Sequence, residues 1–198
     1  MINVLLAGVG GQGTVLASKI LAQAAQDKGW NVRTAETIGM AQRGGSVVSH
    51  VRMGDRGEEI HSPLIPRESA DLIIAFEPAE GARALPYLAP DGMLVTATTA
   101  VPAVTSALGN TAPYRGAQVI QQLFATFADA PERLAIVPDR AILKRVGTRR
   151  ALNTALLAAA ISTNHIPLAM DDLYAAVEIT VKPKFVDLNL KALDEATK

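Results

Sequence analysis

A glycine-rich segment near the start of the chain has the spacing of an anion-binding loop. Gly8-Val9-Gly10-Gly11-Gln12-Gly13 matches the pattern G-x-G-x-x-G and lies between an apolar run and a stretch with helical periodicity. Glycines permit a tight turn and a close approach of phosphate to backbone amides, and the N-terminus of the following helix presents unpaired N–H groups. Glu36, at the end of the next predicted strand, stands where a dinucleotide-binding fold carries its ribose-binding acid.

Gly8, Gly10, Gly11, Gln12, Gly13 and Glu36 therefore predict a nucleotide or phosphate site. In the alternative interpretation the glycines only close a strand-to-helix turn, and Glu36 pairs with a neighbour such as Arg33.

A second cluster combines a thioether, an amide, a cation and glycines within a short connection: Met40-Ala41-Gln42-Arg43-Gly44-Gly45-Ser46. The glycines beside Arg43 allow close backbone approach. We therefore expect this guanidinium to contact a partner or to bind an anion.

Other residues that could do chemistry are weaker candidates. Five cations lie between residues 140 and 150, and such a cluster usually forms a solvated helix face: Arg140, Lys144, Arg145, Arg149 and Arg150.

The histidines His50, His61 and His165 lack metal-ligand spacing, so no metal site is expected. Ser49 and His50 point to opposite faces of a strand and cannot form a catalytic pair. Glu77 and Glu80 around Pro78 are typical of a helix start, although Glu77 could also lie in a ligand crevice. No catalytic residue is assigned.

The elements that position these residues alternate between strand and helix. We expect strands at 2–7, 30–36, 71–76, 93–97 and 134–137, and helices at 14–28, 78–88 and 116–127. The first strand, helix and second strand have the length of a parallel βαβ unit. The connection after Glu36 is too short for a parallel crossover, so residues 46–53 should pair antiparallel. A turn at 54–57 would join them to a short strand near 58–61, and a turn at 90–92 would introduce the strand at 93–97.

The last 60 residues predict a helical tail (about 139–198) with segments at 139–146, 149–163, 170–178 and 183–195. The second segment is almost all Ala and Leu and must be covered, either by this domain or by a partner. The predicted fold is a single α/β domain over residues 1–198, with a Rossmann-like, mostly parallel sheet, helices on both faces and a short antiparallel hairpin insertion.

Composition excludes several classes of function. The 198 residues include 19 basic and 19 acidic ones, so the basic excess of a nucleic-acid-binding protein is missing. The chain has no cysteine, which excludes disulfides, a cysteine nucleophile and iron–sulfur clusters held by its own thiolates. The apolar start is too short for a signal peptide, and no run of apolar residues could cross a membrane. We expect a cytoplasmic protein.

Beyond these patterns, the chain resembles the gamma domain of the 2-oxoacid:acceptor (ferredoxin) oxidoreductases that use thiamine diphosphate, most closely in the beta subunits of the indolepyruvate branch. The matching stretches are GVGGQG (8–13), GMAQRGGSVVSHVR (39–52), ADLIIAFEPAE (70–80) with Arg83, PYL (86–88) and the Leu/Ala-rich element around Asn153. Thr14 and Ile38 depart from the usual pattern, and Ile38 replaces a histidine frequent in the indolepyruvate branch.

The resemblance implies a subunit of an enzyme that oxidatively decarboxylates an aryl 2-oxoacid such as indolepyruvate, forms acyl-coenzyme A and reduces ferredoxin. A larger alpha subunit would carry thiamine diphosphate, Mg²⁺ and the iron–sulfur clusters, and this chain would be inactive alone. Met40, Gln42, Arg43, Gly44, Gly45 and Ser46 would contact that subunit and complete its active site, and the basic cluster could meet coenzyme A phosphates or an acidic ferredoxin.

Two alternatives remain open on the sequence. The chain could be the gamma subunit of a pyruvate, 2-oxoglutarate or branched-chain 2-oxoacid ferredoxin oxidoreductase. From a different class, it could be a stand-alone nucleotide-binding or NAD(P)-dependent Rossmann protein.

Overall fold

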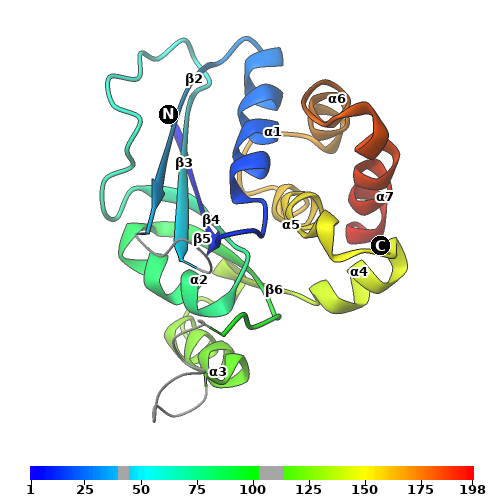
Figure 1. Cartoon of the computed structure of the whole chain (residues 1–198). Coiled ribbons are helices and arrows are strands. Elements are labelled where there is room, and N and C mark those ends of the chain that lie inside the picture. Colours follow the sequence, from blue (N-terminus) through cyan, green and yellow to red (C-terminus); the bar gives the residue numbers. More distant parts are fainter. Residues whose placement is uncertain (40–44, 103–113) are drawn as a thin grey trace.

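A six-stranded sheet in the order β2-β3-β1-β4-β5-β6 forms the centre of the molecule (Figure 1). The structure, a computed structural model, describes residues 1–39, 45–102 and 114–198. The strands are β1 (Ile2–Val9), β2 (Asn31–Ile38), β3 (Ser46–Gly54), β4 (Ala70–Ala75), β5 (Leu88–Ala97) and β6 (Leu134–Val137). β1, β4, β5 and β6 pair in parallel, whereas β3 pairs antiparallel with both β1 and β2.

Helices cover both faces of this sheet (Figure 1). They are α1 (Thr14–Asp27), α2 (Pro78–Ala84), α3 (Gly116–Thr126), α4 (Asp139–Val146), α5 (Leu152–Ile161), α6 (Met170–Thr180) and α7 (Val186–Ala196). Short 3-10 turns at Leu85–Tyr87, Pro131–Arg133, Arg149–Ala151 and Pro183–Phe185 join some of them. The α/β class, the mostly parallel sheet and the helical tail are as predicted. Within the described ranges, no helix is long and apolar enough to span a bilayer.

The two faces of the sheet bury cores of unequal size. Alternate residues of β1 point to opposite sides: Val4 and Leu6 join the core under α1 and α4 to α7, and Leu5 and Ala7 join the smaller core under α2 and α3. The α5 helix is buried almost throughout, as its Ala/Leu composition predicts. It packs against α1, α4, α6 and α7 of this same chain. The cover that its sequence demands is therefore intramolecular.

The two strands of the predicted parallel βαβ unit, β1 and β2, are not neighbours in the sheet. β2 runs in the same direction as β1, but β3 lies between them and pairs with each along its length, from Ile2↔Met53 to Val9↔Ser46 on one side and Asn31↔Gly54 to Ile38↔Val47 on the other. The antiparallel pairing of residues 46–53 is confirmed. The nine-residue β3 can form this double ladder because its residues are mostly buried between two neighbours.

The predicted turn at 54–57 is present over residues 55–57, but the strand expected near 58–61 and the turn expected at 90–92 are wrong. Residues 58–61 form no strand. Side chains, instead of a neighbouring strand, bond to backbone carbonyls in and beside this segment: Asn31 Nδ2 donates to the Glu58 carbonyl at 2.9 Å, and Arg52 Nη1 donates to the Ser62 carbonyl at 2.8 Å. Residues 90–92 lie inside β5, whose pairing with β4 shifts register there. Gly92 permits this irregularity, since a Cβ at that position would stand 2.5 Å from the Ala70 carbonyl oxygen.

Candidate functional site

The glycine loop at the carboxyl end of β1 has a backbone conformation that only glycine adopts readily. Gly11 and Gly13 have φ angles of 98° and 85°, in the left-handed region that favours glycine. Gly8 is buried, and a Cβ there would stand 2.8 Å from Thr14 Cγ2 and 3.0 Å from Phe76 Cβ. Gly10 N–H donates to the Gly45 carbonyl at 2.9 Å. The loop therefore brings backbone close to its surroundings in a way that side chains would prevent.

The Gln12 side chain has a structural task that sequence reasoning did not assign. Its Oε1 accepts from Val9 N–H at 2.7 Å, and its Nε2 donates to the Phe76 carbonyl at 2.9 Å. The amide thus joins the carboxyl ends of β1 and β4, the point at which open α/β sheets have their ligand crevice. Both polar atoms of the Gln12 amide are therefore engaged within the chain.

A cavity of about 830 Å³ opens beside the loop, toward α4 and α5. Three stretches line it, namely the loop with the start of α1, the segment after β5, and the region from α4 to α5: Gly11, Gln12, Gly13, Leu16, Thr99, Val101, Asp139, Arg140, Leu143, Lys144, Gly147, Thr148, Arg149, Arg150, Leu152 and Asn153. The fold thus brings the glycine loop and the basic cluster, which are far apart in the sequence, to the same cavity.

The loop's side of the cavity offers donors that suit an anion and one buried acceptor that needs a donor instead. Gly13 N-caps α1 without a side chain, and the first bond within the helix is from Ala17 N–H to the Gly13 carbonyl, which leaves the preceding first-turn amides for a ligand. Asn153 is 2% exposed, and its Oδ1 has no hydrogen-bond partner among the described residues. An unpaired buried amide costs about 1–3 kcal/mol. A ligand with both donors and acceptors would remove this cost.

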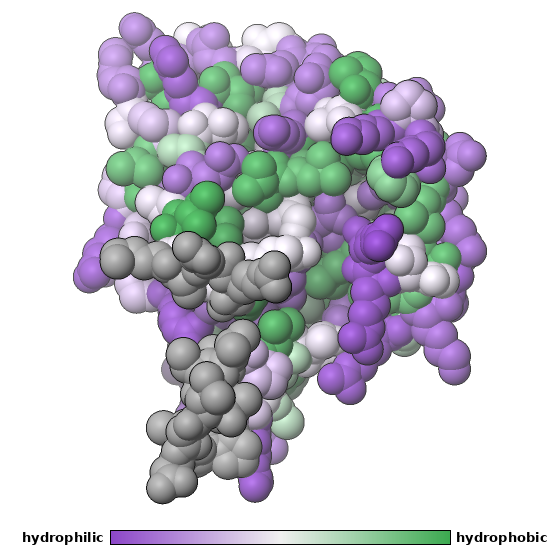
Figure 2. Space-filling model, in the orientation of Figure 1, coloured by the Kyte–Doolittle hydropathy of each residue, from purple (hydrophilic) through white to green (hydrophobic). Residues whose placement is uncertain are grey.

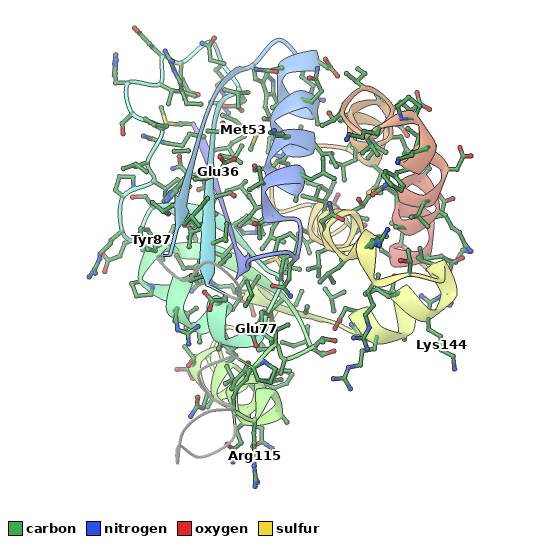
Figure 3. The ribbon with its side chains drawn as sticks, in the orientation of Figure 1. Glu36, Met53, Glu77, Tyr87, Arg115 and Lys144 are labelled. Atoms are coloured by element: carbon green, nitrogen blue, oxygen red, sulfur yellow. The ribbon has the colours of Figure 1, made fainter. Side chains whose placement is uncertain are left out.

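The opposite side of the cavity is cationic. Arg140, Lys144, Arg149 and Arg150 line it and are exposed to solvent, whereas Arg145 turns away and its Nε donates to Glu195 Oε2 at 2.7 Å. Figure 2 shows hydrophilic side chains gathered over the α4 region, and Figure 3 shows Lys144 at the end of α4. Four of the five cations therefore line the cavity.

Asp139, the first residue of α4, is a buried carboxylate within this wall. It accepts from the amide and hydroxyl of both Thr98 and Thr99, over 2.5–3.1 Å. Arg140 Nε donates to the Thr99 hydroxyl at 3.2 Å. The four donors satisfy the carboxylate and join the end of β5 to the start of α4. Because this bonding combines distant segments, sequence reasoning missed Asp139 and Thr99.

Glu36 lies away from the cavity. It is exposed on the edge strand β2, in register with Ser49 of β3, which is in turn in register with Leu6 of β1. Strands are about 4.8 Å apart, so two spacings of about 10 Å in total separate β2 from β1. Figure 3 shows Glu36 far from Lys144. No ion pair joins Glu36 to Arg33 in the described structure.

The second glycine cluster is only partly described. Met40, Gln42, Arg43 and Gly44 lie outside the described residues. Gly45 and Ser46 adjoin the glycine loop through the Gly10–Gly45 bond, and Ser46 Oγ donates to Glu80 Oε2 at 2.6 Å. The described end of the second cluster therefore adjoins the glycine loop.

Glu77 caps α2, as the helix-start interpretation predicts, because its Oε2 accepts from Glu80 N–H at 3.1 Å. His50 is also buried; its Nδ1 accepts from Ile65 N–H, and burial lowers the pKa of its imidazole. Within the described ranges, no group of three or more metal-ligating side chains occurs.

Comparisons with known proteins agree with this architecture. The family model described as pyruvate ferredoxin/flavodoxin oxidoreductase matches residues 3–198. A protein of Archaeoglobus fulgidus named indolepyruvate oxidoreductase subunit IorB is 38% identical over 97% of this chain and 92% of its own length. Among solved structures, the gamma subunit of a keto/oxoacid ferredoxin oxidoreductase from Geobacter sulfurreducens has a TM-score of 0.68 at 21% identity, covering 100% of this chain and 96% of that one.

The structure of 2-oxoglutarate:ferredoxin oxidoreductase from Magnetococcus marinus, with 2-oxoglutarate, coenzyme A and succinyl-CoA bound, has a TM-score of 0.69 at 18% identity. The match covers 98% of this chain and 30% of that one, so the same fold occurs there as part of a longer polypeptide. Fold, glycine clusters and sequence match together show that this chain belongs to the pyruvate ferredoxin/flavodoxin oxidoreductase family.

Proposed function

We propose that this chain is the smaller subunit of a thiamine-diphosphate-dependent 2-oxoacid:ferredoxin oxidoreductase with an aryl 2-oxoacid, such as indolepyruvate, as substrate. The observation that carries the proposal is its similarity, along nearly its whole length, to a protein named as an indolepyruvate oxidoreductase subunit. The complex would decarboxylate the 2-oxoacid, transfer the acyl group to coenzyme A and pass two electrons to ferredoxin.

The residues of this chain do not fit the redox cofactors of such a complex. Iron–sulfur clusters need thiolates, and the chain has no cysteine. A Gly-Asp-Gly segment followed by Mg²⁺-ligating residues, which would hold thiamine diphosphate, is also missing from the sequence. We therefore place both cofactors in a larger alpha subunit.

The cavity supports a more specific task, the binding of the phosphate groups of coenzyme A. The glycine loop before α1 and the cations Arg140, Lys144, Arg149 and Arg150 line one space. The unsatisfied Asn153 Oδ1 needs a donor, which an amide or amine of coenzyme A, and not its phosphates, would supply. A volume of about 830 Å³ is more than a single phosphate needs. Leu16, Leu143 and Leu152 add apolar lining, which suits a ligand with both phosphates and an organic part.

A stand-alone NAD(P)-dependent enzyme is not favoured. Such a fold places an acid at the end of the strand next to β1, where it can meet the ribose. In this chain the neighbour of β1 on that side is β3, and Glu36 lies on the strand beyond it.

The experiment that tests the proposal is reconstitution. The chain alone should show no reduction of ferredoxin or dye with indolepyruvate and coenzyme A, and the proposed larger subunit should be equally inactive alone. The co-purified complex should be active. Activity of the isolated chain, or of the larger subunit alone, contradicts the proposal. Pyruvate, 2-oxoglutarate and 2-oxoisovalerate assayed in parallel identify the substrate class.

A further inference from the structure

The strand β2 is an edge strand without the usual protections against the addition of another strand. It is last in the order of the sheet, has eight residues and pairs with β3 in unbroken register from Asn31↔Gly54 to Ile38↔Val47 (Figure 1). It contains no proline, no lysine and no bulge, and all of its residues are exposed or half-buried. An edge of this kind is a template for pairing with a further strand.

Alternate residues of β2 direct their backbone groups away from β3. Gly39 N–H, just beyond the strand, donates to the Ser46 carbonyl at 2.8 Å. Because bonded and non-bonded pairs alternate in an antiparallel ladder, the odd-numbered residues of β2 bond to β3 and the even-numbered ones face outward. The outward residues are therefore Val32, Thr34, Glu36 and Ile38. Within the described ranges, no backbone group of another segment bonds to them.

The side chains of the outward residues lie on the face of the sheet that α1 covers, where Val32 packs against the larger core. A groove of about 290 Å³ lies beside them, lined by Thr34, by Lys19 and its neighbours on α1, and by the end of α6. Lys19 makes no ion pair with a described residue, and neither does the exposed Glu36. The edge thus has an acid and a base that one further strand could bring together.

We propose that β2 is a dimerisation surface whose partner is a second copy of this chain, which is independent of the proposed function. A twofold axis perpendicular to the sheet makes the two β2 strands antiparallel and joins the two sheets into one. The axis keeps α1 of both copies on the same face. Since outward residues can bond only to outward residues, an even-numbered residue of one copy must lie opposite an even-numbered residue of the other.

Charge excludes two of the possible registers. One would place Arg33 directly opposite Arg33 of the second copy, and another would do the same with Glu36. Like charges directly opposite each other destabilise a sheet. The two registers between them are centred on Thr34 and on Ala35, and only the second keeps every outward residue of β2 paired within the strand.

The register centred on Ala35 also covers exposed groups. It places Ile38, which is 69% exposed, opposite Val32 of the second copy. It places Glu36 of the second copy opposite Thr34, beside the groove that Lys19 lines. The symmetry forms each of these contacts twice. An apolar contact and an ion pair at both ends of the shared ladder therefore favour a second copy as the occupant of this edge.

Disulfide formation tests the register, because the chain contains no cysteine of its own. In the full-length chain, Ala35→Cys would place two thiols opposite each other at the twofold axis, within reach of a disulfide after a small adjustment. Arg33→Cys is the matched control, because its two thiols would be displaced along the strands, beyond that reach. Mild oxidation should give a covalent dimer of Ala35→Cys and leave Arg33→Cys without one.

Charge reversal tests the ion pairs. In sedimentation velocity of a dilution series, the wild-type chain should be a reversible dimer. Glu36→Lys and Lys19→Glu should each raise its dissociation constant about tenfold at low salt, since repulsion replaces two exposed pairs. The double variant should restore the wild-type constant. Arg33→Glu, a reversal on the same strand but on the opposite face, should leave the constant nearly unchanged.

A wild-type chain that stays monomeric at every concentration overturns the inference and would leave the edge to a strand of another protein. Equal cross-linking of Ala35→Cys and Arg33→Cys overturns it as well. A dimer whose dissociation constant is the same in Glu36→Lys, Lys19→Glu and the wild type would also contradict it. Thermal melting of each variant, carried out first, establishes that the variants compared are folded.

Discussion

The two walls of the cavity differ in the groups that they offer to a ligand. The wall built by the glycine loop and Asn153 offers backbone amides and a buried side chain in fixed positions, and it carries no net charge. The wall built by Arg140, Lys144, Arg149 and Arg150 offers full charges on long, exposed side chains. Fixed dipoles select the shape of a ligand, whereas exposed cations mainly raise its local concentration and are screened by salt. Substitutions in the first wall should therefore cost more affinity.

The largest effect is expected at Gly13. Its φ angle of 85° costs a non-glycine residue about 1–2 kcal/mol, and a Cβ would stand 3.2 Å from Asn153 Nδ2. Gly13→Ala should lower the free energy of unfolding by about 2 kcal/mol and weaken coenzyme A binding by about 100-fold, because amides and Asn153 both shift.

Gly29→Ala is the control for Gly13→Ala. Gly29 has a φ angle of 77°, but nothing lies within 4 Å of a Cβ there. Denaturant unfolding should show a loss of about 1 kcal/mol from the backbone alone, with coenzyme A binding unchanged. Equal effects of both substitutions on binding would mean that the loop's position next to Asn153 is irrelevant to the ligand.

An intermediate effect is expected at Asn153. Asn153→Ala removes the unpaired Oδ1, so it should leave stability nearly unchanged and weaken coenzyme A binding about tenfold, as measured by calorimetric titration of the assembled complex. Asn31→Ala removes an amide on β2 outside the cavity and should leave binding unaffected. Unchanged affinity in Asn153→Ala would assign the ligand to another surface.

The smallest effect is expected in the cationic wall. Arg149→Gln should weaken coenzyme A binding about threefold at low salt, since an exposed charge contributes less than about 1 kcal/mol. The dependence of the dissociation constant on salt should become shallower. Arg145→Gln removes an equal charge that is paired with Glu195, so it should have less effect on both quantities. A loss at Arg149 larger than that at Asn153 would reverse the ranking of the two walls.

Local patterns in the sequence predicted most of the fold and singled out the glycine loop and the basic cluster, which both line the cavity. Local residue types alone predict the buried strands β1 and β4, the glycine loop and the buried helix α5. They do not predict the order of the strands, because a strand that can pair antiparallel with β1 or β2 can also lie between them. The position of Glu36 depends on that order, which is why the sequence alone put it beside the loop.

The rest of the site depends on contacts between distant segments. The sequence places Gln12 in a loop, but it does not predict that the Gln12 amide joins β1 to β4. It likewise places Asp139 at the start of a helix, but it does not predict that Thr98 and Thr99 donate hydrogen bonds to this carboxylate. The sequence does single out Asn153, because an amide in a buried helix of Ala and Leu costs stability unless it has a hydrogen-bond partner or a function.

The central claim, that this cavity holds coenzyme A within the complex, is tested most directly by photoaffinity labelling. The assembled complex would be irradiated with a coenzyme A analogue that carries a photoreactive adenine, and the labelled peptides would be mapped by mass spectrometry. We predict label on the residues between 139 and 153 or at the glycine loop of this chain, with excess coenzyme A suppressing it. Label confined to the larger subunit would contradict the account.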